Sequence, residues 1–317
     1  MSEPTITLGI SACLLGEQVR WDGTHKRDPL FTDQLSRFVR FISVCPEVEM
    51  GFGVPREPCC LMGDSLAPRI VTRRTGEDHT QRLLRWARRR VRELEGEAVS
   101  GFILKEKSPS CGLERVAVYD ARGARQAAGP GLFARALRAH LPLIPLATDS
   151  RLHDPRLLAG FIERVSVMQR WRETARQTRS RGALVRFHAE HALVLLSQSP
   201  RHYRLMGGLV ARAKATPLAV LYAEYEQALV EALLLKATPA KHANCLQHIL
   251  SDCKKNLSPE AKQELQASIA AYRQGRCPLS APLTLINHYV RLFDQPYLTK
   301  QYYLRPHPLE LFVRNHR

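Results

Sequence analysis

The sequence lacks the features of exported and membrane-bound proteins. No apolar run approaches the length of about 20 residues that a transmembrane helix needs. The first residues, MSEPTITLGIS, carry an acidic side chain at position 3 and no basic leader ahead of the apolar stretch. No lipidation signal or long amphipathic anchor is present. We therefore expect a cytoplasmic protein without a membrane partner.

Acidic residues are scarce relative to basic ones. The 317 residues include 47 Lys and Arg but only 30 Asp and Glu, which gives a formal net charge of +17. An excess of this size is typical of proteins that bind a polyanion such as a nucleic acid. The alternative is an ordinary basic cytosolic protein whose charge serves no partner.

Paired C-x2-C motifs, the ligand pattern of structural zinc modules, are also absent. The eight cysteines are dispersed along the chain. In a reducing compartment disulfides are disfavoured, so metal binding or catalysis is the expected use of these thiols.

Strand-like apolar runs alternate with helical stretches in the first half of the chain. This alternation predicts an α/β domain over residues 1–155, with a doubly wound and mainly parallel sheet. The expected strands lie near 5–12, 40–45, 99–104, 115–119 and 141–147, and the expected helices at 32–39, 78–94 and 131–140.

Strand patterns disappear in the second half. Residues 156–186 are rich in arginine and predict a basic helical linker, and residues 187–317 predict an all-α domain for RNA binding or substrate selection. The tail at 296–311 is interrupted by proline, so we expect only short turns there. The expected amphipathic helices lie at 183–197, 201–214, 217–235, 240–253, 259–274 and 283–293.

Three cysteines each follow a strand-like run. Cys13 ends TITLGISAC, Cys45 follows RFISV, and Cys111 lies in the turn after GFILKEK. If these runs are neighbouring parallel strands, their carboxyl ends meet at one edge of the sheet and the three thiols converge. A metal centre with three protein ligands keeps one position open for chemistry. The alternative for each cysteine is a small buried core residue.

Several dispersed segments resemble a known family. SACLLGEQVRWDG (11–23), VCPEVEMGFGVPREP (44–58) and LKEKSPSCG (104–112) resemble the thiouracil desulfidase family, over roughly residues 5–150. Family members commonly have Tyr where Trp21 stands. The second half resembles the helical domain of two-domain transfer-RNA 4-thiouridine desulfidases. Its matching segments are FHAEH (187–191), KHANCLQHI (241–249), YRQGRCPLSAPLTLINHYV (272–290) and PYLTKQYYLRPHP (296–308).

This resemblance implies a [4Fe–4S] cluster held by Cys13, Cys45 and Cys111. The iron that lacks a thiolate would bind the substrate's sulfur, because a thiocarbonyl sulfur is a softer ligand than a carbonyl oxygen. Water would then replace the sulfur at carbon, giving uridine and sulfide without net electron transfer.

Water attack requires a group that accepts a proton. Glu47, two residues after Cys45, is the expected carboxylate; the alternative is a solvated loop glutamate. Ser108 matches the active serine of the family, and Ser110 is the alternative.

The segment RLLRWARRRVR between Arg82 and Arg92 holds six arginines. On a helix, the apolar stripe would be Leu84, Ala87, Val91 and Leu94. We predict that the nearly opposite face contacts RNA; the alternative is a solvated helix face. This face is called the basic ridge and consists of Arg82, Arg85, Arg89 and Arg92.

The sequence therefore favours an iron–sulfur-dependent desulfidase acting on thiolated uracil, with 4-thiouridine in transfer RNA as the preferred substrate. Two alternatives stay open. One is a desulfidase of free thiouracil bases, and the other is a non-catalytic iron–sulfur sensor that binds nucleic acid. A sensor needs the three thiols but has no use for Glu47 or Ser108. The oligomeric state is not set by the sequence.

Overall fold

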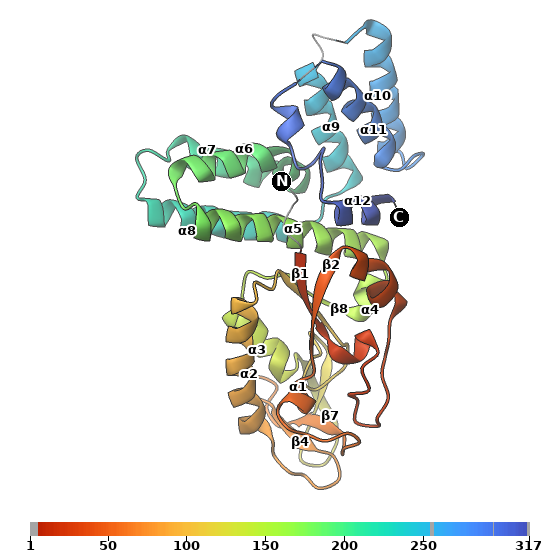
Figure 1. Ribbon diagram of the computed structural model, residues 1–317, viewed down its shortest axis with the longest axis vertical. Helices are drawn as coiled ribbons and strands as arrows, with labels where there is room; N and C mark the ends of the chain where they lie inside the picture. The colour runs from red at the N-terminus through yellow and green to blue at the C-terminus, as the bar shows by residue number, and fades with distance from the viewer. Residues whose placement is uncertain (1–5, 254–256, 294, 316–317) are drawn as a thin grey trace. The chain divides into compact units, whose positions relative to one another are not determined.

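The computed structural model describes residues 6–253, 257–293 and 295–315. The chain divides into two compact units, residues 1–168 and 169–317 (Figure 1). The first unit is α/β with a parallel main sheet and the second is helical, so the predicted fold class is confirmed. Among the described residues, no helix is both long enough and apolar enough to cross a membrane.

The main sheet of the first unit has the strand order β2-β1-β5-β8, and all of its pairings are parallel. Every residue of β1 is buried, as expected for a strand covered on both faces. The order reverses at β1, which has β2 on one side and β5 on the other, so the β1–β5 boundary is the topological switch point where such sheets bind ligands. The strands are β1 Ile6–Ser11, β2 Val39–Val44, β5 Gly101–Leu104 and β8 Leu146–Thr148.

Two helices of the first unit pack together against this sheet (Figure 1). The ring of Phe133 on α3 lies 5.2 Å from that of Trp86 on α2 and 5.6 Å from that of Phe102 on β5. These aromatic contacts join both helices to the strand that precedes Cys111. The helices of this unit are α1 Pro46–Glu49, α2 Thr80–Gly96, α3 Leu132–His140, α4 Asp149–Leu152 and the first part of α5 Pro155–Gln177.

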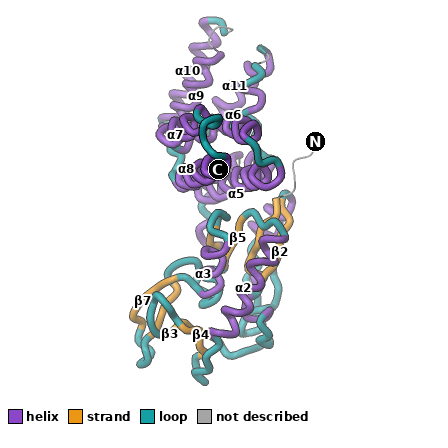
Figure 2. The backbone as a smooth tube through the Cα atoms, turned by 90° about the vertical axis from the view of Figure 1, so that its left-hand side faces the viewer, coloured by secondary structure: helices purple, strands orange, loops and turns teal. Residues whose placement is uncertain are grey.

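A second, smaller sheet was not anticipated. Its order is β4-β3-β6-β7, and its strands are β3 Cys59–Met62, β4 Arg69–Thr72, β6 Val116–Tyr119 and β7 Arg125–Gly129 (Figure 2). The strand predicted near 115–119 joins this sheet and not the main one. Strands of four or five residues give too little periodicity to be recognised in the sequence.

The helix predicted at 32–39 is wrong. A π turn at Leu30–Gln34 and a 3-10 turn at Leu35–Arg37 occupy this region, and β2 already begins at Val39. Phe31 and Leu35 are both buried, which mimics one face of a helix over a segment too short to continue. A further 3-10 turn, Ala12–Leu15, follows β1 and carries Cys13.

The second unit is a helical bundle whose six predicted helices all exist. Serine side chains cap three of them, because Ser180, Ser199 and Ser258 accept hydrogen bonds from backbone N–H groups of α6, α7 and α10. The tail forms one turn and also the helix α12, which the prolines had argued against. The elements are α6 Arg181–Gln198, α7 Pro200–Ala211, α8 Leu218–Leu234, α9 Pro239–Cys253, α10 Pro259–Arg273, α11 Ser280–Leu292, the 3-10 turn Leu298–Lys300 and α12 Pro308–Asn315.

Candidate active site

The three sequence-selected cysteines lie at the carboxyl ends of adjacent strands. Cys13 follows β1, Cys45 follows β2, and Cys111 lies in the loop after β5. Because β2, β1 and β5 are neighbours in the main sheet, the three thiols lie at one edge of it. Cys13 and Cys111 are buried, and Cys45 is half-buried.

The thiols are close enough for their charges to interact. Burial raises the pKa of Cys13 to about 11, and the neighbouring Cys45 raises it further. Burial also raises the pKa of Cys45. It raises the pKa of Cys111 well above its ordinary value, with Cys45 and Cys13 adding to the effect. Such a cluster of thiols ionises readily only when a cation compensates the negative charge.

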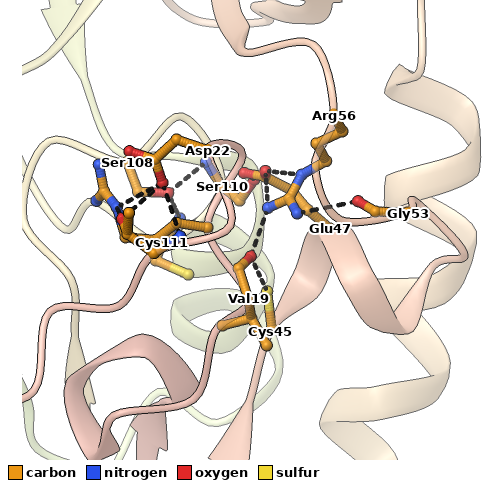
Figure 3. A network of polar contacts seen from close by, with 11 residues as sticks. Val19, Asp22, Cys45, Glu47, Gly53, Arg56, Ser108, Ser110 and Cys111 are labelled. Atoms are coloured by element: carbon orange, nitrogen blue, oxygen red, sulfur yellow. Dashed lines mark hydrogen bonds and ion pairs between the residues drawn. The ribbon is translucent and has the colours of Figure 1, made fainter.

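Glu47 is a fixed carboxylate at the same edge (Figure 3). Arg56 donates to its Oε2 from Nε at 2.9 Å and from Nη2 at 2.6 Å. The Ser110 hydroxyl donates to Oε1 at 2.9 Å. The side chains of Arg56 and Glu47 are only 9% and 13% exposed. Glu47 is therefore held on both oxygens and is not a solvated loop glutamate.

Arg56 also ties Glu47 to the chain beside Cys45. Its Nη2 donates to the carbonyl oxygen of Val19 at 2.9 Å, and the Cys45 thiol donates to the same oxygen at 3.7 Å (Figure 3). Its backbone N–H donates to the carbonyl of Trp21 at 2.8 Å. Sequence reasoning did not select Arg56, although it lies in the VPREP part of a family-like segment.

The two candidate serines have different surroundings. The half-buried Ser108 accepts hydrogen bonds through Oγ from the backbone N–H groups of Ser110 at 3.3 Å and Cys111 at 3.1 Å. It therefore shapes the turn that presents Cys111. Ser110 is fully buried and is the serine that contacts Glu47.

Close backbone packing holds this turn in place. A Cβ atom at Gly112 would lie 2.8 Å from the carbonyl oxygen of Ser108, and one at Gly131 would lie 2.5 Å from that of Ser110. The N–H of Phe133 in α3 donates to the Ser110 carbonyl at 3.0 Å. The turn thus rests directly on the start of α3 and needs glycine at both positions.

A fourth strand end contributes a carboxylate that the sequence analysis missed. Asp149, directly after β8, pairs with the Lys105 ammonium at 2.5 Å and accepts the Glu106 N–H at 2.8 Å. Ser11, the last residue of β1, accepts the Lys105 N–H at 2.9 Å and hydrogen-bonds Cys111. Polar residues directly after predicted strands were the signal that could have identified Asp149.

Helix α2 carries the basic ridge, and all four of its arginines are exposed to solvent at least in part. The buried stripe differs slightly from the expected one, because Leu83 and Trp86 are buried whereas Leu84 is half-buried. The helix is rotated so that its large indole, and not Leu84, meets α3. Arg90, outside the ridge, pairs with Glu49, Glu93 and Glu97.

The histidines of the second unit's FHAEH segment are buried and neutral. His188 bonds the Tyr225 hydroxyl at 3.0 Å through Nδ1, and His191 donates from Nδ1 to the Phe187 carbonyl at 2.8 Å. Burial lowers the pKa of His188 to about 4 and that of His191 to about 3. These histidines are part of the helical core.

Comparison with known proteins identifies two families along the chain. Residues 8–149 match the family described as 2-thiouracil desulfurase, and residues 193–308 match a family of proteins of unknown function, DUF1722. A solved [4Fe–4S]-dependent thiouracil desulfidase, TudS, is 32% identical with a TM-score of 0.39, over 48% of this chain and 95% of that chain.

Two curated relatives are both described as uncharacterized proteins. YbgA of Escherichia coli (strain K12) is 34% identical over 137 residues, which are 43% of this chain and 81% of YbgA. YbbK of Bacillus subtilis (strain 168) is 34% identical over 112 residues, which are 32% of this chain and 71% of YbbK.

The resemblance inferred from the first three segments is confirmed for the first half of the chain. The matched family of the second half has no assigned function, so its link to transfer RNA stays a prediction. Over residues 8–149, this chain belongs to the 2-thiouracil desulfurase family.

Proposed function

We propose that this protein is a [4Fe–4S]-dependent desulfidase that converts 4-thiouridine in transfer RNA to uridine and releases sulfide. Family membership supports desulfuration of thiolated uracil. The observation that carries the proposal is the fixed Glu47 carboxylate, which is held by Arg56 and Ser110 at the same sheet edge as three buried thiols.

The donor set fits an iron–sulfur cluster. Among the described residues, no three His, Cys, Asp or Glu side chains are placed to hold a single metal ion. Cys13, Cys45 and Cys111 instead come from three separate strand ends, a spread that suits a cluster in which each thiolate binds a different iron. When bound, the cluster supplies a Lewis-acidic iron with affinity for sulfur.

The protein's own residues would position water and move its proton. Glu47 would accept the proton, because its carboxylate is fixed and needs no reorganisation before the reaction. Arg56 would hold Oε2 in place, and Ser110 would hold Oε1. Ser108 would keep Cys111 at the sheet edge and, as the family's active serine, would donate or accept a hydrogen bond at the substrate ring.

The charge of the chain favours RNA over a free base. The net charge of +17 and the basic ridge offer attraction to phosphates, which a free thiouracil base does not carry. The location of the protein in the cytoplasm, where transfer RNA is abundant, belongs to the same proposal.

Sulfide release tests this function. Anaerobically reconstituted protein is incubated with thiolated transfer RNA and, separately, with free thiouracil, and sulfide is counted per chain. The proposal expects many sulfides per chain from the RNA and fewer from the base. No more than one sulfide per chain would contradict an enzyme and favour the sensor. Equal turnover of both substrates would contradict the preference for RNA.

A further inference from the structure

A pocket of about 290 Å³ lies between the end of helix α1 and helix α2. Its lining combines three arginines with one carboxylate and two apolar side chains. The lining residues are Glu49, Met50, Arg82, Arg85, Trp86 and Arg89.

Arg82 forms a fixed wall of this pocket. Its Nε donates to the carbonyl oxygen of Met50 at 2.8 Å, and its Nη2 donates to that of Gly51 at 3.3 Å. Its guanidinium lies over the ring of Phe52, 5.3 Å from the centroid. A Cβ atom at Gly51 would lie 2.6 Å from Nη2, so the contact depends on glycine. The positive charge is therefore positioned before any ligand arrives.

Arg85 and Arg89 supply further donors. Arg85 forms no side-chain hydrogen bond or ion pair within the described part of the chain. Arg89 is 69% exposed and forms an ion pair with Glu93 at 3.5 Å. Both guanidinium groups can turn toward an anion at small cost in existing contacts.

Glu49 does not cancel this positive charge. Its Oε2 pairs with Nε of Arg90 at 3.3 Å, and its Oε1 accepts the backbone N–H of Cys45 at 3.0 Å. The carboxylate is thus compensated from outside the pocket. It also joins the pocket wall directly to the peptide of a proposed cluster ligand.

We propose that this pocket binds a phosphate group of the substrate nucleotide while its thiolated base occupies the sheet-edge site. The inference rests on the proposed function and extends it, because it assigns a binding site for the phosphate. Arginine forks match phosphate oxygens in geometry and charge. Helix α1 has four residues, so the pocket begins about 6 Å along the helix from Cys45. This spacing suits a base and a phosphate that are separated by one ribose.

Binding of uridine 5′-monophosphate tests the pocket without any sulfur chemistry. We compare the reconstituted protein with Arg85→Ala and with Arg88→Ala by calorimetry. Arg88 is the matched control, because it lies on the same helix but outside both the pocket and the basic ridge. Loss of a charged phosphate contact should weaken binding about 10- to 100-fold in Arg85→Ala. Arg88→Ala should bind like the parent.

Equal binding to the parent and Arg85→Ala would overturn the inference, as would no binding to the parent. A parent that binds the nucleotide through Arg85 but releases no sulfide would instead contradict the proposed function and leave the pocket supported. Desulfuration of thiolated transfer RNA separates the two phosphate sources. A 10- to 100-fold loss of kcat/KM in Arg85→Ala, about that of one charged contact, assigns the pocket to a backbone phosphodiester. An unchanged value, with weakened mononucleotide binding, assigns it to a terminal phosphate.

Discussion

At the scale of single residues, the site depends on side chains that are held on several sides. Arg56 contacts Glu47 and Val19, and Val19 also accepts the thiol of Cys45. A change at Arg56 therefore affects both the carboxylate and the backbone beside a proposed ligand. Function and local structure can be separated here only by substitutions that retain one while removing the other.

Removing a proposed ligand should abolish the cluster. Cys13→Ala, Cys45→Ala and Cys111→Ala should each lose most of the roughly four irons per chain that one cubane holds. Iron analysis and the visible absorption of the anaerobically purified protein measure this loss. Cys60→Ala is the control, because Cys60 lies half-buried on β3 in the second sheet. Full iron content in Cys45→Ala would contradict the assignment of three ligands.

Glu47→Gln should separate chemistry from structure. The amide retains the shape of the carboxylate but cannot accept a proton, so activity should fall roughly 10²–10⁴-fold while iron is retained. Sulfide release and iron content are measured on the same sample. Parental turnover in this variant would show that Glu47 is not the base, whereas loss of iron would show that it supports the site structurally.

The two serines should differ in their effects. Ser110→Ala removes a fully buried hydrogen bond to Glu47 and should lower kcat with little effect on iron content. Ser108→Ala removes the acceptor for the N–H groups of Ser110 and Cys111, so it should also lower the thermal stability of the cluster-bound protein. Thermal unfolding together with turnover distinguishes the variants. The same thermal stability in both would contradict the turn-shaping role of Ser108.

At the scale of elements, strong periodicity was predictive and short segments were not. Helix α2 and the six helices α6–α11 were predicted from their apolar spacing, and the strands before the three cysteines from their apolar runs. The second sheet was missed because β3, β4 and β7 are short and draw their stability from pairing with each other and with β6. The partners of Glu47 were missed because Arg56 and Ser110 approach it only through the fold.

The basic ridge on α2 should make RNA binding sensitive to salt. Replacing Arg85 and Arg89 by Glu should weaken transfer-RNA binding and reduce its log–log salt slope by about 1.4, because each phosphate that is no longer neutralised removes about 0.7. Binding is measured at several salt concentrations for the parent and the double variant. Unchanged affinity would remove α2 from the RNA surface, and parental binding that does not respond to salt would argue against RNA as the partner.

The buried histidines of α6 should make the helical unit sensitive to acid. An unfolded histidine takes up a proton near its ordinary pKa of 6.5, whereas the pKa values of folded His188 and His191 are only about 4 and about 3. Their contribution is therefore intact above pH 6.5 and is lost as the pH falls toward 4, by about 2 kcal/mol per histidine near pH 5.

Urea unfolding of the parent and of His191→Leu at neutral pH and near pH 5 measures this effect. The variant should be less stable at neutral pH, because it loses the bond to the Phe187 carbonyl, but it should lose less stability on acidification. The same acid-induced loss in both proteins would contradict the neutral state of His191.

At the scale of the whole molecule, the account joins a desulfurase-family unit to a helical unit within one basic chain. The family match accounts for the sheet edge with its thiols and carboxylate. The charge and the second unit, whose family has no assigned function, account for the choice of RNA as substrate. These two parts of the account meet in a single reaction.

Nucleoside analysis of transfer RNA tests that reaction most directly. Transfer RNA containing 4-thiouridine is digested and quantified before and after incubation with the anaerobically reconstituted protein, with Cys45→Ala as the matched control. The account predicts that 4-thiouridine disappears, that uridine and sulfide appear in equal amounts, and that the control changes nothing. Unchanged 4-thiouridine in the presence of protein that holds its full iron content would contradict the account.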